Sequence, residues 1–525
     1  MGRYGMAGDH YRQSGYVTLQ DVPDPNREYI ESFDNLVGGM NRFDLDYALK
    51  GNESPFMQNM SWHNGTLTSR LGQVVKKKLD EEFFFMSSAS FLFHGWWLIQ
   101  IPGGLCAVKL KITGDTPNEQ PLYISYSYDF GQEFPRVPGL FFLYRDAVFF
   151  KAKGGYYRVT WQPGSGLAYE NFVFEIIADA TSVSGSGANA FVPTVQMNSN
   201  PATGAGDPFQ QENRLTYKKK ITYNGDGTTQ TYHLPDPYIG ATGLTAKVNG
   251  VTKTVSFQPT DGTIVFDPAD IPPAGQNNVE FEFQKHDSNS QEALESVLNA
   301  QAAITFGGAQ DLCVVMGNTP EQPNAYFWTG NNGIVMDPTY FPMNQYNLAG
   351  DNDDPITVFG KQQNMLVIFQ RNAVGRAVFG TETISDLETV TMNYTRINAE
   401  IGCDLPGSLQ LVDNNLVWCS RRYGVCRLKD SSAAYENNIV QISRKINGDY
   451  RIDGLLKELK DVNDDQVRSV DTGKRYILVL GEVLHLMAFA LQVGLDFFFQ
   501  LGAGMVVGHC YLHGEFLPCY CQNIP

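Results

Sequence analysis

Residues 311–380 constrain the fold more than any other stretch, because short apolar runs alternate there with turn-forming residues. None of the runs is long enough for a helix, and Asn, Pro, Gly and Asp separate them. Four or five short strands joined by loops of unequal length are typical of one β-propeller blade and the edge of the next. The runs cover residues 313–316, 326–328, 356–359, 365–369 and 377–379.

The composition favours an all-β protein. The 525 residues include 33 Phe, 26 Tyr, 51 Gly and 26 Pro, whereas charged residues make up only 18%. Aromatic residues favour strands and Gly and Pro favour tight turns, so helical bundles are disfavoured. A loose internal repeat also suits propeller blades: the apolar run at 366–368 recurs at 416–418 and again at 476–480.

A second strand-rich segment, residues 214–286, has its own turn signals and predicts a small β-sandwich inserted between blades. The preceding residues 181–213 are rich in Ser, Gly, Asn and Pro and predict a linker. Residues 288–303 carry a polar start and a one-sided apolar pattern, which predicts a helix that bridges the insert back to the ring.

We therefore expect a β-propeller-like disc with an inserted sandwich and an irregular N-terminal docking segment. The predicted parts are an arm and docking segment (1–73), the first part of the propeller (74–180), a linker (181–213), the insert (214–286), and a helix followed by the second part of the propeller (287–525). Strands in the first part are predicted at 90–101, 105–112, 123–128, 140–151, 156–161 and 172–177.

One motif supports a propeller without implying a reaction. Ser127, Asp129, Gly131 and Phe134 resemble the Asp-box, with Phe in place of its usual Trp. In propellers this box is a structural hairpin turn, in which the Ser and Asp side chains satisfy backbone groups of the turn.

The formal charge of -17 is the wrong sign for stable DNA binding through Lys and Arg. A negative wall can still serve DNA, because repulsion keeps a polyanion from adhering to a conduit. Asp351, Asp353 and Asp354 form a candidate lumen-facing acidic loop. The alternatives are that the charge only keeps the protein soluble, and that the loop binds Ca²⁺, although it lacks the spacing of a calcium loop.

Residues for catalysis are not evident in the sequence. It has no phosphate-binding loop, nucleophile elbow or zinc-protease motif, so we expect neither an enzyme nor a cofactor. Eight cysteines without a regular framework predict free buried thiols. A terminal cluster (His509, Cys510, His513, Cys519 and Cys521) could supply zinc ligands, but its spacing matches no standard knuckle and unligated residues are favoured.

Both ends of the chain bear on its location. The N-terminus lacks a secretory signal pattern. Residues 483–507 are nearly all apolar, and a membrane helix is one interpretation of them. Asp496 would then lie near its middle at a cost of ~2.5–3.5 kcal/mol, so closing strands of the ring are favoured and stable membrane insertion is not expected.

Several of these segments resemble the nozzle, or tail tubular, proteins of short-tailed bacteriophages. The resemblance covers residues 33–73 and 308–428 and rests on short matches at Asn59-Met60, Arg70-Leu71-Gly72, Gly317-Asn318, residues 337–342 and residues 351–357. It implies a structural virion protein in the tail, made in the host cytoplasm. A homohexamer would bind an adaptor (head-to-tail connector) ring and tail fibres or tip proteins, and DNA would pass through it during ejection. The alternative is a glycan-binding or sialidase-like propeller, which would need clustered arginines.

Overall fold

The computed structural model describes residues 39–44, 49–50, 52–54, 60–63, 66–69, 90–101, 104–111, 122–129, 139–162, 172–179, 189–286, 288–384, 387–432, 438–448, 454–464, 467–471, 475–480, 486–492 and 504–508. Most of these residues lie in small antiparallel sheets, and only two α-helices occur among them. The prediction of an all-β protein is confirmed.

The chain divides into two compact units, which are described separately. The first comprises Met1–Phe84, Gly360–Arg376 and Arg396–Pro525, and the second comprises Phe85–Phe359 and Ala377–Thr395. The first three of the four-stranded sheets described next (residues 90–348), with the insert, belong to the second unit, and the last two (residues 410–508) belong to the first. The residues of the fourth sheet (356–398) are divided between the two units.

Six four-stranded sheets follow one another along the described chain, each with its strands in sequence order. Sheet 1 contains β5 (Ser90–Phe93), β6 (Trp96–Ile101), β7 (Gly104–Lys111) and β8 (Leu122–Asp129). Sheet 2 contains β9 (Leu140–Tyr144), β10 (Ala147–Ala152), β11 (Gly155–Trp161) and β12 (Phe172–Asp179). Sheet 3 contains β22 (Ala302–Phe306), β23 (Cys313–Gly317), β24 (Ala325–Trp328) and β25 (Tyr346–Leu348).

The other three sheets repeat this order. Sheet 4 contains β26 (Ile356–Gln362), β27 (Met365–Gln370), β28 (Val374–Ile384) and β29 (Leu387–Asn398). Sheet 5 contains β30 (Gln410–Val412), β31 (Asn415–Ser420), β32 (Gly424–Leu428) and β33 (Ile439–Gln441). Sheet 6 contains β34 (Arg468–Asp471), β35 (Arg475–Leu480), β36 (Leu486–Gln492) and β37 (Gly504–Gly508). The repeated apolar runs noted in the sequence lie on β27, β31 and β35, the second strand of each sheet.

Two-residue turns join the first strand to the second in four of these sheets. Their φ angles are positive at His94 (48°) in sheet 1, Arg145 (54°) in sheet 2, Asn364 (60°) in sheet 4 and Asn414 (60°) in sheet 5. Positive φ matches the twist of a two-residue hairpin. Because His94-Gly95 and Arg145-Asp146 are such turns, residues 90–101 and 140–151 are hairpins, and the prediction of one continuous strand in each was wrong.

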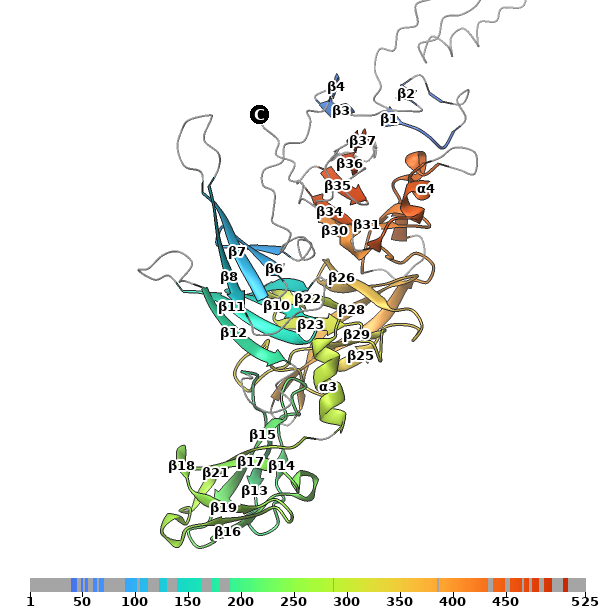
Figure 1. Ribbon diagram of the computed structural model, residues 1–525. Helices are drawn as coiled ribbons and strands as arrows, with labels where there is room; N and C mark the ends of the chain where they lie inside the picture. The colour runs from blue at the N-terminus through green and yellow to red at the C-terminus, as the bar shows by residue number, and fades with distance from the viewer. Residues whose placement is uncertain are drawn as a thin grey trace, which may run out of the picture. The chain divides into compact units, whose positions relative to one another are not determined.

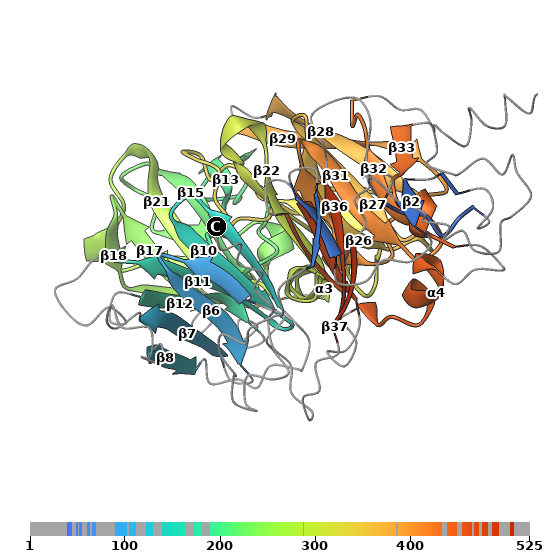
Figure 2. The same cartoon turned by 90° about the horizontal axis from the view of Figure 1, so that it is seen from above.

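Sheets 1 and 2 pack face to face in the second unit. Their strands lie in adjacent layers (Figure 2), and their inner faces bury one cluster that includes Trp96, Leu98, Phe150, Tyr157 and Val159. Alternation along β10 sends Val148 and Phe150 toward sheet 1 and Phe149 to the other face, so sheet 2 is buried on both sides.

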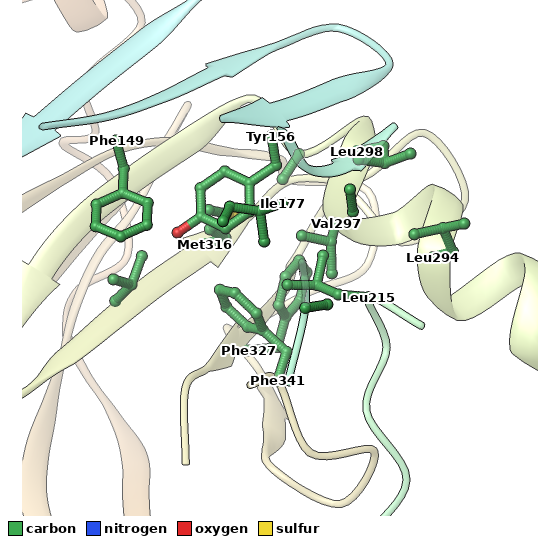
Figure 3. Packing of buried hydrophobic residues seen from close by; sticks show 14 of the residues in the cluster. Phe149, Tyr156, Ile177, Leu215, Leu294, Val297, Leu298, Met316, Phe327 and Phe341 are labelled. Atoms are coloured by element: carbon green, nitrogen blue, oxygen red, sulfur yellow. The ribbon is translucent and has the colours of Figure 1, made fainter. Parts of the chain in front are cut away.

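The other face of sheet 2 packs against sheet 3 and α3 (Ser288–Leu298) (Figure 3). Phe149, Tyr156 and Ile177 contribute from sheet 2, and Met316 and Phe327 contribute from sheet 3. Leu294, Val297 and Leu298 close the cluster from α3. The predicted helix at 288–303 is confirmed for residues 288–298, whereas Ala302 and Ala303 already belong to β22.

The insert consists of two sheets around a separate core (Figure 1). The six-stranded sheet has the order β14 (Asp207–Pro208), β13 (Thr194–Ser199), β15 (Lys218–Gly225), β21 (Gly275–Gln284), β17 (Thr242–Val248) and β18 (Val251–Lys253). The three-stranded sheet has the order β16 (Thr231–His233), β20 (Thr263–Phe266) and β19 (Val255–Gln258). Because β13 and β14 lie in residues 189–213, that part of the predicted linker belongs to the insert.

Sheets 5 and 6 share the main cluster of the first unit with α4 (Leu455–Lys460). Val417 and Val425 contribute from sheet 5, Tyr476 and Leu478 from sheet 6, and Leu459 from α4. The Tyr476 hydroxyl donates a 2.5 Å hydrogen bond to the Ser408 carbonyl. The described residues near the C-terminus, 486–492 and 504–508, are strands paired with β35 and with each other, as the sequence favoured over a membrane helix.

The described N-terminal residues belong to the first unit and contact its core. β1 (Gly39–Met40) pairs in parallel with β2 (Glu53–Ser54), and Met40 is buried in the main cluster. The Glu53 carboxylate accepts hydrogen bonds from Asn41 (2.8 Å) and Lys445 (2.6 Å). Beyond these elements the described residues form the hairpin of β3 (Met60–His63) and β4 (Thr66–Ser69), and the 3-10 turns η4 (Asp236–Tyr238), η5 (Pro268–Asp270), η6 (Gly308–Gln310), η7 (Pro406–Ser408) and η9 (Arg444–Ile446).

Candidate functional site

The acidic loop connects the last strand of sheet 3 to the first strand of sheet 4. Asp351 and Asp353 are exposed and Asp354 is half-buried. The loop is pinned at both ends, because Ala349 N donates to the Asn324 carbonyl (2.8 Å) and Ile356 N donates to the Pro323 carbonyl (2.9 Å). This geometry displays three carboxyl groups on a short, anchored turn.

The loop supplies negative potential rather than an obvious ion site. Within the described residues, no group of three or more His, Cys, Asp or Glu side chains is arranged to hold a metal ion. Asp354 N donates to the Asp351 carbonyl (3.3 Å), which is the pattern of a solvated turn. The exposed carboxylates of Asp351 and Asp353 repel polyanions at short range and attract cationic surfaces.

The first strands of neighbouring sheets lie side by side within each unit. In the second unit β5 contacts β9 and β9 contacts β22, and in the first unit β30 contacts β34. Each of four first strands also exposes a large apolar side chain at its next-to-last residue: Leu92, Leu143, Leu411 and Val470. Within each unit, these neighbouring sheets therefore meet along their first strands.

The Asp-box-like segment lies only partly within the described residues. Ser127 and Asp129 belong to the end of β8, opposite Cys106 and Gly104 of β7. Gly131 and Phe134 lie outside the described residues. The strands on either side, β8 and β9, belong to different sheets, and the turn expected from the motif lies outside the described residues.

Four cysteines within the described part of the chain are buried thiols, as predicted: Cys313, Cys403, Cys419 and Cys426. Burial raises the pKa of the Cys313 and Cys403 thiols to about 12, which makes them unreactive at neutral pH. Cys419 and Cys426 lie on the adjacent strands β31 and β32, one register position apart. The terminal cluster of His509, Cys510, His513, Cys519 and Cys521 lies outside the described residues.

A glycan-binding or sialidase-like site would need arginines that are available to bind a sugar carboxylate. Arg158 pairs with Glu175 across β11 and β12. In the first unit, Arg421 binds both Asp404 and Asp464 and donates to the Val462 carbonyl (2.8 Å). These two guanidinium groups are occupied by carboxylates of their own unit, so neither presents a free cation for a sugar carboxylate.

Two residues that sequence reasoning missed anchor the insert. The Arg214 guanidinium donates to the Met343 carbonyl (2.9 Å) and lies over the rings of Phe327 and Tyr346. Asn213 donates to the Thr339 carbonyl (2.9 Å) and accepts from Phe341 N (2.9 Å). Both residues sit in a polar run whose composition gives no sign of these contacts.

A third missed residue is Lys151, whose amine is buried beside the end of α3. It lies within β10, where the other five residues are apolar. That isolated charge in an otherwise apolar strand is a signal the sequence did offer.

Comparisons with known proteins give no family. No family model matches the chain, and no curated protein matches it. The solved structure of apo AztD from Citrobacter koseri aligns with a TM-score of 0.31 and 7% identity, over 80% of this chain and 88% of that chain. A similarity at that level carries no conclusion about fold or function. None of the helices in the described residues has the length and apolar character needed to span a membrane.

Proposed function

We propose that this chain is a structural protein of a short-tailed phage tail, in which it forms a ring-shaped wall of the conduit for the genome. The observation that carries the proposal is the run of six four-stranded sheets in sequence order, interrupted once by the insert. Together with the resemblance of residues 33–73 and 308–428 to nozzle proteins, this repeat supports one propeller-like disc per chain.

In this proposal the insert projects from the disc as a small β-sandwich between the second and third blades. Its core contains Tyr223, Tyr232 and Phe281 and shares no residue with the cluster between sheets 2 and 3. Asn213 and Arg214 fix its base to the connection between β24 and β25. A rigidly held insert suits a contact with fibres or tip proteins.

The work of such a protein is passive. Stacked sheets give stiff walls, because close-packed cores resist deformation. The net charge of -17 and the loop of Asp351, Asp353 and Asp354 would repel DNA and let it slide past without adhering. The proposed partners are five further copies of the chain, an adaptor ring, tail fibres or tip proteins, and DNA in transit.

Assembly tests the proposal. The full chain is purified and its mass distribution measured by mass photometry, alone and with the adaptor ring of its virion. We expect hexamers with an open centre on the adaptor, visible by negative-stain electron microscopy. A chain that remains monomeric in both samples contradicts the proposal, as does its absence from purified tails probed with an antibody against it.

The acidic loop has its own test. Replacing Asp351, Asp353 and Asp354 by Asn should leave assembly intact and slow genome ejection several-fold, because DNA would adhere more to a less negative wall. The matched control replaces three exposed acids of the insert by Asn: Asp207, Asp236 and Asp267. Unchanged ejection kinetics in the loop variant, or equal slowing in the control, would remove the loop from the proposal.

A further inference from the structure

Lys151 is a buried amine without an acidic partner. The residue is 4% exposed, and its amine donates to the Ala300 carbonyl. No ion pair in the described part of the chain includes it. A charged amine in an apolar site is costly without a counter-ion, so the neutral form is favoured there.

The same hairpin holds the end of α3 at a second point. Gly154 N, in the turn between β10 and β11, donates to the Leu298 carbonyl (3.0 Å). Lys151 and Gly154 therefore bind the carbonyls of two residues at and just beyond the C-terminus of α3. That terminus leads directly into β22, so it is where the chain returns from the insert to sheet 3.

The groups around the amine give it no compensating charge. Its cross-strand neighbours are Leu140 and Tyr156, and Lys153 adds positive charge nearby. The acids of α3, Glu292 and Glu295, are exposed, whereas the buried side of the helix is apolar. Asp179 acts on Tyr157, whose ring packs on the opposite face of sheet 2.

We propose that Lys151 is an acid-sensitive latch that ties the end of α3, and with it the return from the insert, to sheet 2. When the amine is neutral, it donates to the Ala300 carbonyl and the apolar cluster stays closed. When it takes up a proton, the charge requires water or an anion that the site does not offer. The amine then breaks its hydrogen bond to the Ala300 carbonyl, and the last turn of α3 becomes less stable.

The direction of the pH effect follows from the burial. Burial lowers the pKa of Lys151 from 10.5 to about 7, and Lys153 contributes in the same direction. Between these values the unfolded chain binds more protons than the folded chain, so this group makes the fold more stable as pH rises. Below about pH 7 the full penalty of the buried charge applies, and the latch is open.

Hydrogen exchange of the full chain tests the latch. Exchange of peptides covering residues 294–301, corrected for the intrinsic pH dependence, is followed from about pH 5.5 to 9. We expect protection to stay constant below about pH 7 and to rise above it by up to about tenfold per pH unit, since the unfolded chain then keeps the proton that the folded chain has lost. In Lys151→Met the pH dependence should vanish, and in the control Lys153→Met it should remain.

The result that overturns the proposal is equally specific. Protection that does not change with pH in the wild type, or that changes around a midpoint near 4, would assign the end of α3 to other groups. A Lys151→Met variant whose protection changes with pH as in the wild type would also overturn the proposal. Because the wild-type titration is decisive alone, a Lys151→Met variant that does not fold leaves the test intact.

Discussion

The six four-stranded sheets, called meander sheets here because their strands lie in sequence order, differ from the insert in how their strands pair. In the six meanders each strand pairs with the next one along the chain, often through a two-residue turn. In the insert β15 pairs with β21 across 49 residues of intervening chain and also pairs in parallel with β13. Strands that pair with the next strand along the chain give a periodic pattern of apolar residues and turns in the sequence. Strands that pair with distant segments give no such pattern.

The largest expected effect tests whether the two kinds of core are independent. Phe281 is fully buried in the insert core. Its replacement by Ala should destabilise the insert by ~3–5 kcal/mol through the cavity left behind. Hydrogen exchange should speed up in residues 194–284 and stay unchanged in sheets 5 and 6.

Trp418→Ala is the matched variant in a meander. Its ring is buried against Phe369 and its Nε1 donates to the Gly402 carbonyl (2.9 Å). We expect Trp418→Ala to lower the free energy of unfolding by a similar amount, with faster hydrogen exchange confined to the first unit. If either variant speeds exchange in both regions alike, the two cores unfold as one and the comparison fails.

A smaller effect is expected where a distant segment docks on a meander unit. The Glu53 side chain is 2% exposed and pairs with Lys445, 392 residues away. Glu53→Gln should cost ~2 kcal/mol, because it removes a charge-assisted hydrogen bond. Chemical denaturation followed by tryptophan fluorescence measures it, and Asp44→Asn, at an exposed acid close by, is the control.

Glu53 and Lys151 should both make the fold more stable as pH rises, but over different pH ranges. Burial raises the pKa of Glu53, but the hydrogen bonds from Lys445, Asn41 and Lys50 together lower it below its usual 4.5. Its stabilisation is therefore present above about pH 4.5 and is lost as pH falls further. An acid-unfolding midpoint that does not move in Glu53→Gln would contradict this assignment.

The next effect concerns Gly402, which packs closely against a neighbouring backbone segment. A Cβ built on Gly402 would lie 2.3 Å from the carbonyl oxygen of Gln370, the last residue of β27, and 2.4 Å from that of Arg371 in the connection to β28. Gly402→Ala should destabilise the first unit by ~1–3 kcal/mol, because the backbone must shift. Gly95→Ala is a useful contrast, since nothing lies within 4 Å of its Cβ position and only its positive φ opposes the change. Equal thermal stability of Gly402→Ala and the wild type would show that the connection relaxes freely.

The smallest effect concerns the turns that make the meanders local. Asp413 adopts φ 46° between β30 and β31, a conformation that Gly adopts without strain. Asp413→Gly should change stability by no more than about 0.5 kcal/mol, because relief of strain and added chain entropy oppose each other. Thermal unfolding measures it, and a loss above about 2 kcal/mol would mean that the side chain has a role beyond the turn.

The sequence predicted strands best where pairing is local. The runs at 313–316, 326–328, 356–359, 365–369 and 377–379 all lie within β23, β24, β26, β27 and β28. The hairpins at His94 and Arg145 were missed because neither turn interrupts the apolar run with the usual Asn-Gly pair. β25 was missed because its three residues are too few to show a period.

The candidate site was less predictable than the fold. The exposure of Asp351 and Asp353 follows from their turn, but the anchoring of that loop by residues 323–324 depends on three-dimensional contacts. β13 escaped recognition because its parallel partner β15 lies beyond a polar stretch that resembles a linker. Arg214 anchors the insert partly through the rings of Phe327 and Tyr346, which lie more than 100 residues away in the sequence. No local sequence pattern predicts such a contact.

In the proposed function, the sheets on both sides of the insert form one disc that serves as the wall of a conduit. Cryo-electron microscopy of the full chain assembled on its adaptor ring tests this most directly. We expect six copies around an open channel, each with all six meander sheets in one closed disc and with the insert outside it. A map in which the two compact units stand apart as separate bodies, or in which the discs enclose no channel, would contradict it.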